Sequence, residues 1–282
     1  MYKKLFYRDC YLKTGWVPMQ PLTRKLALGD VCQIRQGRFQ PLLNIVDAHL
    51  LEEIRVSQAV ALDASTWELS RGVQQSSSKI TACKDDDGDR YQRTKQVLEF
   101  AKAGSFMFHG SEPNAHFILN WDKISEDLIL KLTQLHYSFR NAYVITGVVS
   151  MKNWGLAVAG KGGAWLAMTA AVGNTDWYSM LSHNSAKTVK CEGMSCNEMA
   201  RGMPSHFFKA KKLVLSNVMH DHFIHHLLHN RAELNPVEIA NWLEGDLLNL
   251  CRNNELNLST CLNFFDWVDV SLDDVELLID QG

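Results

Sequence analysis

The feature that most constrains the fold is an apolar stretch in the middle of the chain that glycines interrupt. Residues 154–159 and 164–172 are apolar runs, and residues 160–163, Gly-Lys-Gly-Gly, separate them. The whole stretch is about as long as the ~20 residues that a helix needs to cross a bilayer. Three glycines and a cation at its centre disfavour such a helix, because glycine weakens a helix and charge is costly in lipid. A glycine-rich turn between two apolar runs instead predicts a β-hairpin.

Further strands are predicted on both sides of this stretch. Residues 143–149, Tyr-Val-Ile-Thr-Gly-Val-Val, are β-branched and aromatic, a composition typical of strands. Turn signals flank residues 31–35, and residues 39–45 are a possible hairpin partner for them. The first 69 residues are expected to be short strands and turns, with one exception given below. Shorter strands are expected at residues 96–100, 104–108, 116–119 and 209–215.

Helical signals are fewer in this part of the chain. Asp122 can cap a helix over residues 123–135, in which Ile124, Leu128 and Leu132 share one face. Residues 47–56 fit a second helix by the same spacing.

Two further regions have distinct sequence patterns, a polar segment at residues 76–90 and a helical region from residue 218. Residues 76–90 contain three consecutive serines and a cluster of charges, which cannot pack a core, so we expect a mobile loop there. From residue 218 the pattern is helical, with a strong start signal at Asn235-Pro236. The chain is therefore predicted to be α+β: a twisted, mostly antiparallel sheet with flanking helices and a helical C-terminal segment.

Charge is distributed unevenly along the chain. Residues 221–282 contain 12 acidic and 2 basic residues, whereas residues 1–220 contain 19 acidic and 27 basic ones. Such asymmetry suggests a basic surface for an anionic partner and an acidic segment that covers it. Acidic helices that merely solvate the surface would give the same counts. We expect a body over residues 1–229 and an acidic, helical segment over residues 230–282 that can act as an autoinhibitor.

The cysteines and the first residues indicate the compartment. Seven cysteines show no framework spacing, and the first ten residues are too short and too charged for a signal peptide. These features predict a soluble protein of the reducing cytoplasm.

Catalytic signals are weak. His222 and His226 lie four residues apart, a spacing that can bind zinc on a helix, but no glutamate follows the first histidine as in zinc hydrolases. They are weak metal candidates, and a metal-dependent hydrolase using residues 220–229 stays an alternative function. We expect no catalytic residue and no cofactor, so an enzyme is not the favoured class.

A basic segment with aromatic residues is the candidate binding element. Phe207 and Phe208 precede Lys209, Lys211 and Lys212. These residues could contact anionic lipid or nucleic acid, or the lysines could protect an edge strand. A non-catalytic module that binds nucleic acid or protein is therefore the other alternative.

The order of these elements resembles the layout of bacterial and fungal gasdermins. The nearest local match is the strand at residues 143–149 followed by a polar kink and a second strand, and the resemblance covers about residues 10–260. It implies a pore-forming body that a C-terminal segment holds inactive, in a pathway of cell death or antiviral defence. It also implies an activating protease of the caspase or CHAT type, after which the body oligomerises on membrane lipid. Nucleic acid is not among the implied partners.

The resemblance also implies roles for particular residues. Bacterial members carry a cysteine near the N-terminus that can be lipidated, and Cys10 is the candidate here. Lys209, Lys211 and Lys212 are the candidate contacts to anionic lipid. Leu156 and Val158 alternate with small residues, as do Leu166 and Met168, which is the pattern of a barrel wall. The candidates for the membrane-inserting hairpin are Trp154, Leu156, Val158, Trp165, Leu166 and Met168. The apolar faces expected to dock the inhibitory segment are formed by Trp242, Leu243, Leu247, Phe264, Phe265 and Trp267.

Overall fold

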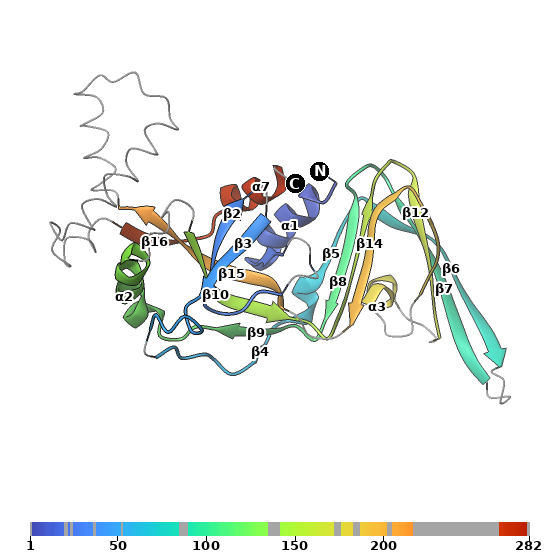
Figure 1. Ribbon diagram of the computed structural model, residues 1–282. Helices are drawn as coiled ribbons and strands as arrows, with labels where there is room; N and C mark the ends of the chain where they lie inside the picture. Colours follow the sequence, from blue (N-terminus) through green and yellow to red (C-terminus); the bar gives the residue numbers. More distant parts are fainter. Residues whose placement is uncertain are drawn as a thin grey trace, which may run out of the picture.

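The chain folds into three β-sheets with helices packed against them (Figure 1). The computed structural model describes residues 2–19, 22, 25–35, 38–51, 53–84, 90–134, 142–171, 176–182, 187–201, 205–216 and 265–280. An eight-stranded sheet lies toward one end of the molecule and two four-stranded sheets lie toward the other (Figure 1). The predicted α+β class and the antiparallel pairing are confirmed, with the strands divided among three sheets.

The eight-stranded sheet is built around β10 (Ala142–Ser150), the strand predicted at residues 143–149. One edge of β10 pairs with β15 (Ser205–Leu215), and the other pairs with β2 (Asp30–Arg35) and β9 (Asn114–Phe117). β2 and β3 (Arg38–Asn44) form the hairpin expected from the turn signals. Three short strands complete the sheet: β1 (Val17–Pro18), β4 (Val60–Ala61) and β16 (Phe265–Asp269).

Both faces of this sheet are covered, which explains the apolar sequence of β10. Tyr143 and Ile145 belong to a large core that includes residues of helix α1 (Lys4–Thr14), and Val144 belongs to a smaller core with helix α2 (Trp121–Gln134). A strand buried on both faces needs apolar residues at successive positions rather than at alternate ones.

Helix α1 (Lys4–Thr14) was not expected, because the first 69 residues were predicted to be strands and turns. Phe6, Tyr7 and Cys10 are its buried residues, and they share the face that packs on the sheet. The helix ends at Gly15, which has a φ of 70° and donates its N–H to the carbonyl oxygen of Tyr11. Apolar spacing followed by a glycine C-cap was the available signal.

Helix α2 (Trp121–Gln134) confirms the helix predicted from Asp122 onward, up to the end of the described residues there. Leu128 and Leu132 are buried against the eight-stranded sheet, as the apolar stripe indicated.

The helix predicted at residues 47–56 is wrong. The described residues of this range, 47–51 and 53–56, form turns and extended chain. Asn120 ties them to the start of α2 by accepting from the N–H of Arg55 and donating to the carbonyl of Glu53. Leu50 and Ile54 still pack against the core around α2. The spacing of apolar residues therefore indicated burial correctly, but tertiary contacts determined the backbone conformation.

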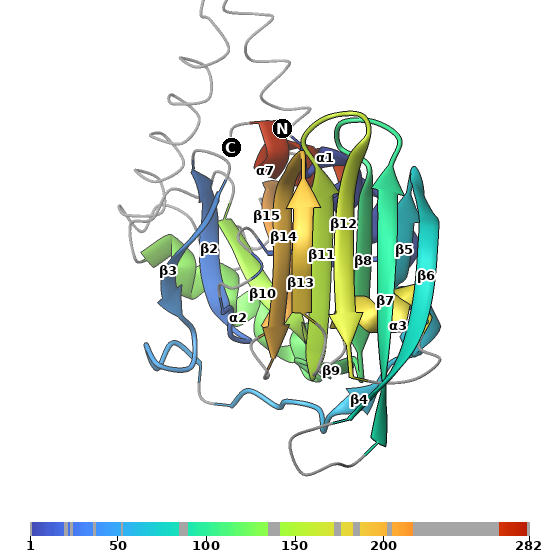
Figure 2. The same cartoon turned by 90° about the vertical axis from the view of Figure 1, so that its right-hand side faces the viewer.

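The two four-stranded sheets have matching strand orders. The inner sheet, nearer the eight-stranded sheet, has the order β14-β11-β8-β5, and the outer sheet has the order β13-β12-β7-β6 (Figures 1 and 2). The inner strands are β5 (Glu68–Arg71), β8 (Phe106–Ser111), β11 (Asn153–Ala159) and β14 (Met194–Arg201). The outer strands are β6 (Val73–Lys84), β7 (Arg90–Phe100), β12 (Ala164–Ala170) and β13 (Lys187–Glu192). The 3-10 helix η1 (Ala64–Trp67) precedes β5.

Four tight corners connect the inner sheet to the outer sheet. Each inner strand and its counterpart in the outer sheet are neighbours in sequence: β5 with β6, β8 with β7, β11 with β12, and β14 with β13. Each corner contains a glycine with positive φ, a conformation in which side chains are strained: Gly72, Gly104, Gly163 and Gly193. At Gly72 a Cβ would also lie 2.6 Å from Ser105 Oγ. The two sheets are therefore four strand pairs folded back on themselves.

This arrangement corrects the predicted hairpin over residues 154–172. The two apolar strands form as β11 and β12, but β11 pairs with β8 and β14, whereas β12 pairs with β7 and β13. The glycine-rich turn joins strands of different sheets, so it makes a corner rather than a hairpin. Both runs are apolar because each strand lies in the middle of its own sheet.

The loop predicted at residues 76–90 is also wrong over its described part. Residues 76–84 belong to β6, which pairs with β7 along its whole length. β6 is an exposed edge strand, and its polar sequence suits an edge, where no second sheet covers it. The polar composition therefore indicated correctly that these residues are exposed. Pairing with β7 is what makes them a strand rather than a mobile loop.

Candidate functional site

The contact between the inner and outer sheets is apolar. The buried residues come from both sheets and from helix α3 (Trp177–Ser182), and they are Leu98, Phe100, Met107, Ala157, Ala159, Ala164, Leu166, Met168, Ala170, Met180 and Leu181. Along β12 the inward side chains alternate with more exposed ones, such as Trp165 and Thr169. The outer sheet is thus amphipathic, with its apolar face turned toward the inner sheet.

Helix α3 lies between the two sheets and contacts β8, β11, β12 and β14 (Figure 1). Gly155 of β11 makes room for it, because a Cβ there would lie 2.6 Å from Leu181 Cγ and would also collide with the Leu181 carbonyl oxygen. Two hydrogen bonds fix the helix to the inner sheet: Ser182 to His109 Nδ1 at 2.5 Å and Tyr178 to Ser70 at 2.5 Å. Helix α3 therefore acts as a wedge that the inner sheet holds in place.

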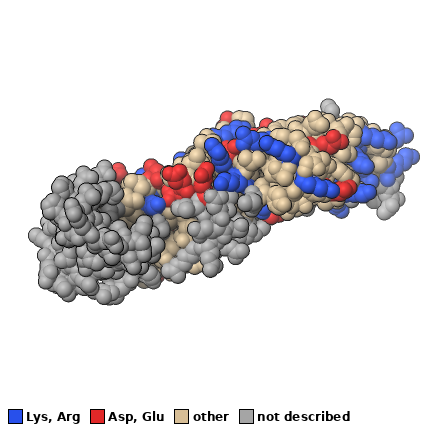
Figure 3. Space-filling model, turned by 90° about the horizontal axis from the view of Figure 1, so that it is seen from above, with Lys and Arg blue, Asp and Glu red and all other residues tan. Residues whose placement is uncertain are grey.

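Basic side chains gather at the free end of the outer sheet (Figure 3). β6 and β7 extend beyond the other strands of this sheet (Figure 2), and both strands carry exposed lysines and arginines (Figure 3). These cations were not among the basic residues selected from the sequence.

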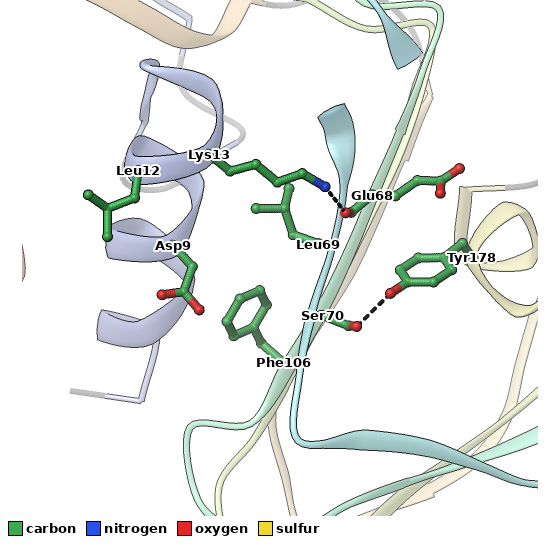
Figure 4. Close-up of a pocket in the computed structure, with 8 residues that line it drawn as sticks. All are labelled: Asp9, Leu12, Lys13, Glu68, Leu69, Ser70, Phe106 and Tyr178. Carbon is green, nitrogen blue, oxygen red and sulfur yellow. Dashed lines mark hydrogen bonds between the residues drawn. The ribbon is translucent and has the colours of Figure 1, made fainter. Parts of the chain in front are cut away.

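A hollow of about 460 Å³ lies where α1, β5 and α3 meet (Figure 4). On one side Lys13 donates to the carbonyl oxygen of Glu68, and on the other Tyr178 bonds to Ser70 (Figure 4). These contacts attach both helices to β5, so the residues around the hollow have a structural role.

Next to this hollow, Ser182, His109 and Glu68 are arranged in the order of a hydrolase triad. His109 Nδ1 bonds to Ser182, and its Nε2 lies 3.7 Å from Glu68 Oε1. Burial lowers the pKa of His109, while the charge of Glu68 opposes that shift. Both Ser182 and His109 are only 8% exposed and neither lines the hollow. The arrangement holds α3 rather than presenting a nucleophile.

The described C-terminal residues, 265–280, form an arm that packs on the body (Figure 1). Its strand β16 pairs with β15 from Lys211 to Leu215, and its helix α7 (Leu272–Asp280) contacts α1. Tyr11 of α1 also donates to the carbonyl oxygen of Val270 at 2.7 Å. Because β1 covers the start of the same edge, at Phe207 and Phe208, segments from both ends of the chain cap β15.

Acidic residues of the arm pair with the lysines of β15. Lys211 Nζ lies 2.9 Å from Asp269, and Lys212 Nζ lies 2.7 Å from Asp274. Asp274 is buried and also accepts a hydrogen bond from Tyr143 at 2.7 Å. Burial alone would raise the pKa of Asp274, but hydrogen bonds from Lys212, Ser271 and Tyr143 lower it below its usual range. The arm thus covers and neutralises two of the three lysines selected from the sequence.

The described residues of the expected docking set lie in this arm. Phe265 is buried in the core around α2, and Trp267 donates its indole N–H to the carbonyl oxygen of Ser125. They dock from a strand, not from the amphipathic helix expected for this region. The boundary at residues 229 and 230 lies outside the described residues, as do Trp242, Leu243, Leu247, Phe264, His222 and His226.

Two further candidates lie on the body. Cys10 is fully buried in α1, and burial raises the pKa of its thiol to about 12. Lipid attachment at Cys10 would therefore require α1 to leave the sheet. Lys209 lies over the ring of Trp16, 4.9 Å from its centroid, beside the arm.

A buried histidine joins the eight-stranded sheet to the inner sheet. His206 of β15 donates from Nδ1 to the Leu22 carbonyl oxygen at 2.6 Å, and its Nε2 accepts from the indole N–H of Trp154 on β11 at 2.8 Å. These partners define a neutral imidazole, since a protonated ring could not accept from Trp154. Burial lowers the pKa of His206, although its bond to Leu22 opposes the shift.

We expect the free energy of unfolding to decrease in mild acid. The folded-state pKa of His206 lies below the ~6.5 of an unfolded chain, so stability is complete above that pH and is lost as the pH falls toward the folded value. The slope for one histidine is up to about 1.4 kcal/mol per pH unit. Urea denaturation between pH 8 and pH 5 measures it, and His206→Gln should give a shallower slope than the exposed control His49→Gln. Equal slopes for both variants would contradict this assignment.

The described residues contain no group of three or more side chains placed to hold a metal ion. In the same residues, no helix is both long and apolar enough to cross a membrane.

The chain has a structural neighbour of low similarity among the solved structures. No family model matches the chain, and no curated protein matches it. Among solved structures, the cryo-EM structure of the Gasdermin A3 membrane pore is a structural neighbour, with 9% sequence identity and a TM-score of 0.35. The match covers 77% of this chain and 90% of that chain. A likeness at this TM-score carries no argument about function.

Proposed function

We propose that this chain is an autoinhibited pore-forming protein. The observation that carries the proposal is the pair of four-stranded sheets folded back at glycine corners over an apolar interface. If the corners straighten, the outer sheet swings away from α3 and presents an apolar face on one side and a polar face on the other. A sheet with these two faces suits the wall of a membrane pore, where one face contacts lipid and the other contacts water.

The dimensions support this role for the outer sheet. A strand needs about 9–11 residues to cross a bilayer at the usual tilt. β6 has 12 residues and β7 has 11, while β12 and β13 are shorter in the folded-back form. Among the described residues, the two edge strands of the outer sheet, β6 and β13, have no further strand partner, so β6 of one copy is available to pair with β13 of the next copy. Self-association side by side would close a ring.

The arm supports autoinhibition by the segment over residues 230–282. Removing it would uncover Lys211 and Lys212 as contacts for anionic lipid, together with Lys209, and would free the edge of β15. A protease that cuts between body and arm would turn a tethered contact into one that can dissociate. In this proposal the protein waits in the cytoplasm, moves to the membrane after cleavage, and acts in cell death or antiviral defence.

Dye release from anionic liposomes tests the function. The intact chain is compared with the same chain nicked at a protease site inserted between His229 and Asn235. Release only after nicking supports the proposal. The absence of release in both states, with nicking verified, would reject it.

A disulfide between arm and body sharpens this test. Val214 of β15 and Asp266 of β16 are register partners, and Cα atoms of such partners lie about 4.5–5.5 Å apart, within reach of a disulfide. We expect a nicked Val214→Cys/Asp266→Cys chain to stay inactive when oxidised and to release dye when a reductant is added. The two single substitutions, Val214→Cys alone and Asp266→Cys alone, are the matched controls. Each should release dye without reductant after the same oxidation and nicking.

A further inference from the structure

The outer face of the outer sheet carries a row of cations that runs across its strands. Lys79 of β6 and Lys95 of β7 are register partners, and Thr169 of β12 is the register partner of both Lys95 and Lys187 of β13. All three lysines are exposed. Register partners point to the same side of a sheet, so these residues form one line about 4.8 Å apart from strand to strand.

Two more cations lie beside this row on the same face. Arg93 is two residues from Lys95 on β7, which places both on one side, and Lys190 of β13 lies over the Trp165 ring, 5.6 Å from its centroid. The described acidic residues of this face, Glu99 and Glu192, lie near the corners instead, in register with Trp165. Glu192 is paired with the corner residue Lys161 at 3.3 Å.

This placement is unfavourable for the folded-back protein taken alone. Like charges directly opposite each other on neighbouring strands destabilise a sheet. Lys79 and Lys95 are opposite each other, and neither has an ion-pair partner among the described residues. The opposite face of the same strands carries Leu98, Leu166 and other apolar residues, together with the buried Thr94 and Gln96 of β7. That face is the more apolar one, so the cations belong to the water side of the opened sheet.

We infer that the cationic row lines the lumen of the pore and makes the pore prefer anions. The inference rests on the proposed function, since only the opened sheet forms a lumen. Each copy in a ring would contribute Lys79, Lys95 and Lys187 at the same height, and rings of lysine or arginine select for anionic permeants. Small anions and acidic solutes would then pass more readily than cations of the same size.

Planar-bilayer recording with the nicked chain under a potassium chloride gradient tests the inference. We expect a reversal potential that reports a chloride-to-potassium permeability ratio above one, and a ratio below one for Lys79→Glu/Lys95→Glu. The matched control is Lys123→Glu, the same change at an exposed site of α2, and it should keep the original ratio. Four aspartates fall within residues 85–89, outside the described residues, and the double variant leaves them unchanged.

The outcomes separate the inference from the function on which it rests. Conductance with a potassium preference, or with a ratio that the double variant leaves unchanged, overturns the inference and leaves the pore standing. No conductance from nicked chain of verified cleavage overturns the pore and the inference together. Dye release by the variants shows that they still fold and insert, as expected for side chains that are exposed in the folded-back protein.

Discussion

Asp274→Ala is expected to release the arm without any cleavage. The substitution leaves Lys212 in a partly buried site without its anion, and it also removes the acceptor for Tyr143. Removing one partner of such a pair costs about 3 kcal/mol. It further removes a helix cap, because Ser271 donates its backbone N–H and its hydroxyl to Asp274 at the start of α7. The intact variant should therefore leak dye from anionic liposomes, where the wild-type chain does not.

Asp273→Ala is the matched control for this prediction. Asp273 lies in the same first turn of α7 but is exposed, so its loss should change dye release and stability little. Hydrogen exchange of the β16 amides gives a second measurement, and faster exchange is expected only for Asp274→Ala. An Asp274→Ala chain with wild-type exchange and no leakage would show that this ion pair does not retain the arm.

Acid should weaken the same contact in the wild-type chain. The folded pKa of Asp274 is depressed, so its contribution is present above the unfolded value of about 3.9 and is lost as the pH falls through the folded value. This window lies below the one predicted for His206. Hydrogen exchange of the β16 amides, measured across both pH ranges, can therefore distinguish release of the arm from loss of the His206 contact between the eight-stranded sheet and the inner sheet.

Gly155→Ala is expected to expel α3 from between the two sheets. The added methyl would collide with Leu181, and backbone atoms of α3 cannot yield without moving the helix. Overpacking of this kind costs about 2 kcal/mol. Displacement would also break the bonds of Ser182 to His109 and of Tyr178 to Ser70. We expect a lower melting temperature and a change in the fluorescence of Trp177, which packs beside the inter-sheet core.

Gly162→Ala is a suitable control because it lies in a corner of the same strand pair. A Cβ there meets its nearest atom, the Ala101 carbonyl oxygen, at 3.2 Å, and small shifts can relieve this contact. If α3 is the wedge that keeps the sheets folded back, nicked Gly155→Ala should release dye faster than nicked Gly162→Ala. Slower or equal release would mean that α3 has no part in opening.

Sequence patterns predicted individual strands and helices better than they predicted which strands pair with each other. β10 and α2 were found because their signals lie within one segment: β-branched residues in the first, and a cap with an apolar stripe in the second. The corner at residues 160–163 was taken for a hairpin turn because glycine permits either, and only the pairing of β11 with β8 decides between them. That pairing joins residues some 45 positions apart, which no local pattern reports.

The residues to which we assign a role in the proposed function were harder to predict for the same reason. Lys209, Lys211 and Lys212 stand out in sequence because they cluster, whereas Lys79, Lys95 and Lys187 come together only through strand register. Asp274 had a local signal, since Ser271 three residues earlier forms a capping box with it. Its burial against Lys212 depends on the fold alone.

The order in which the edge of β15 is covered has a consequence for biosynthesis. β15 can pair with β1 and β10 as soon as residues up to 216 have left the ribosome, but β16 begins only at Phe265. Every new chain therefore passes through a stage at which the partners of β15 in the body have been made and the arm has not. At 5–20 residues per second this stage lasts seconds. If the arm is the inhibitor proposed above, the rate at which it docks, and not only its affinity, determines how safely a cell can produce this protein.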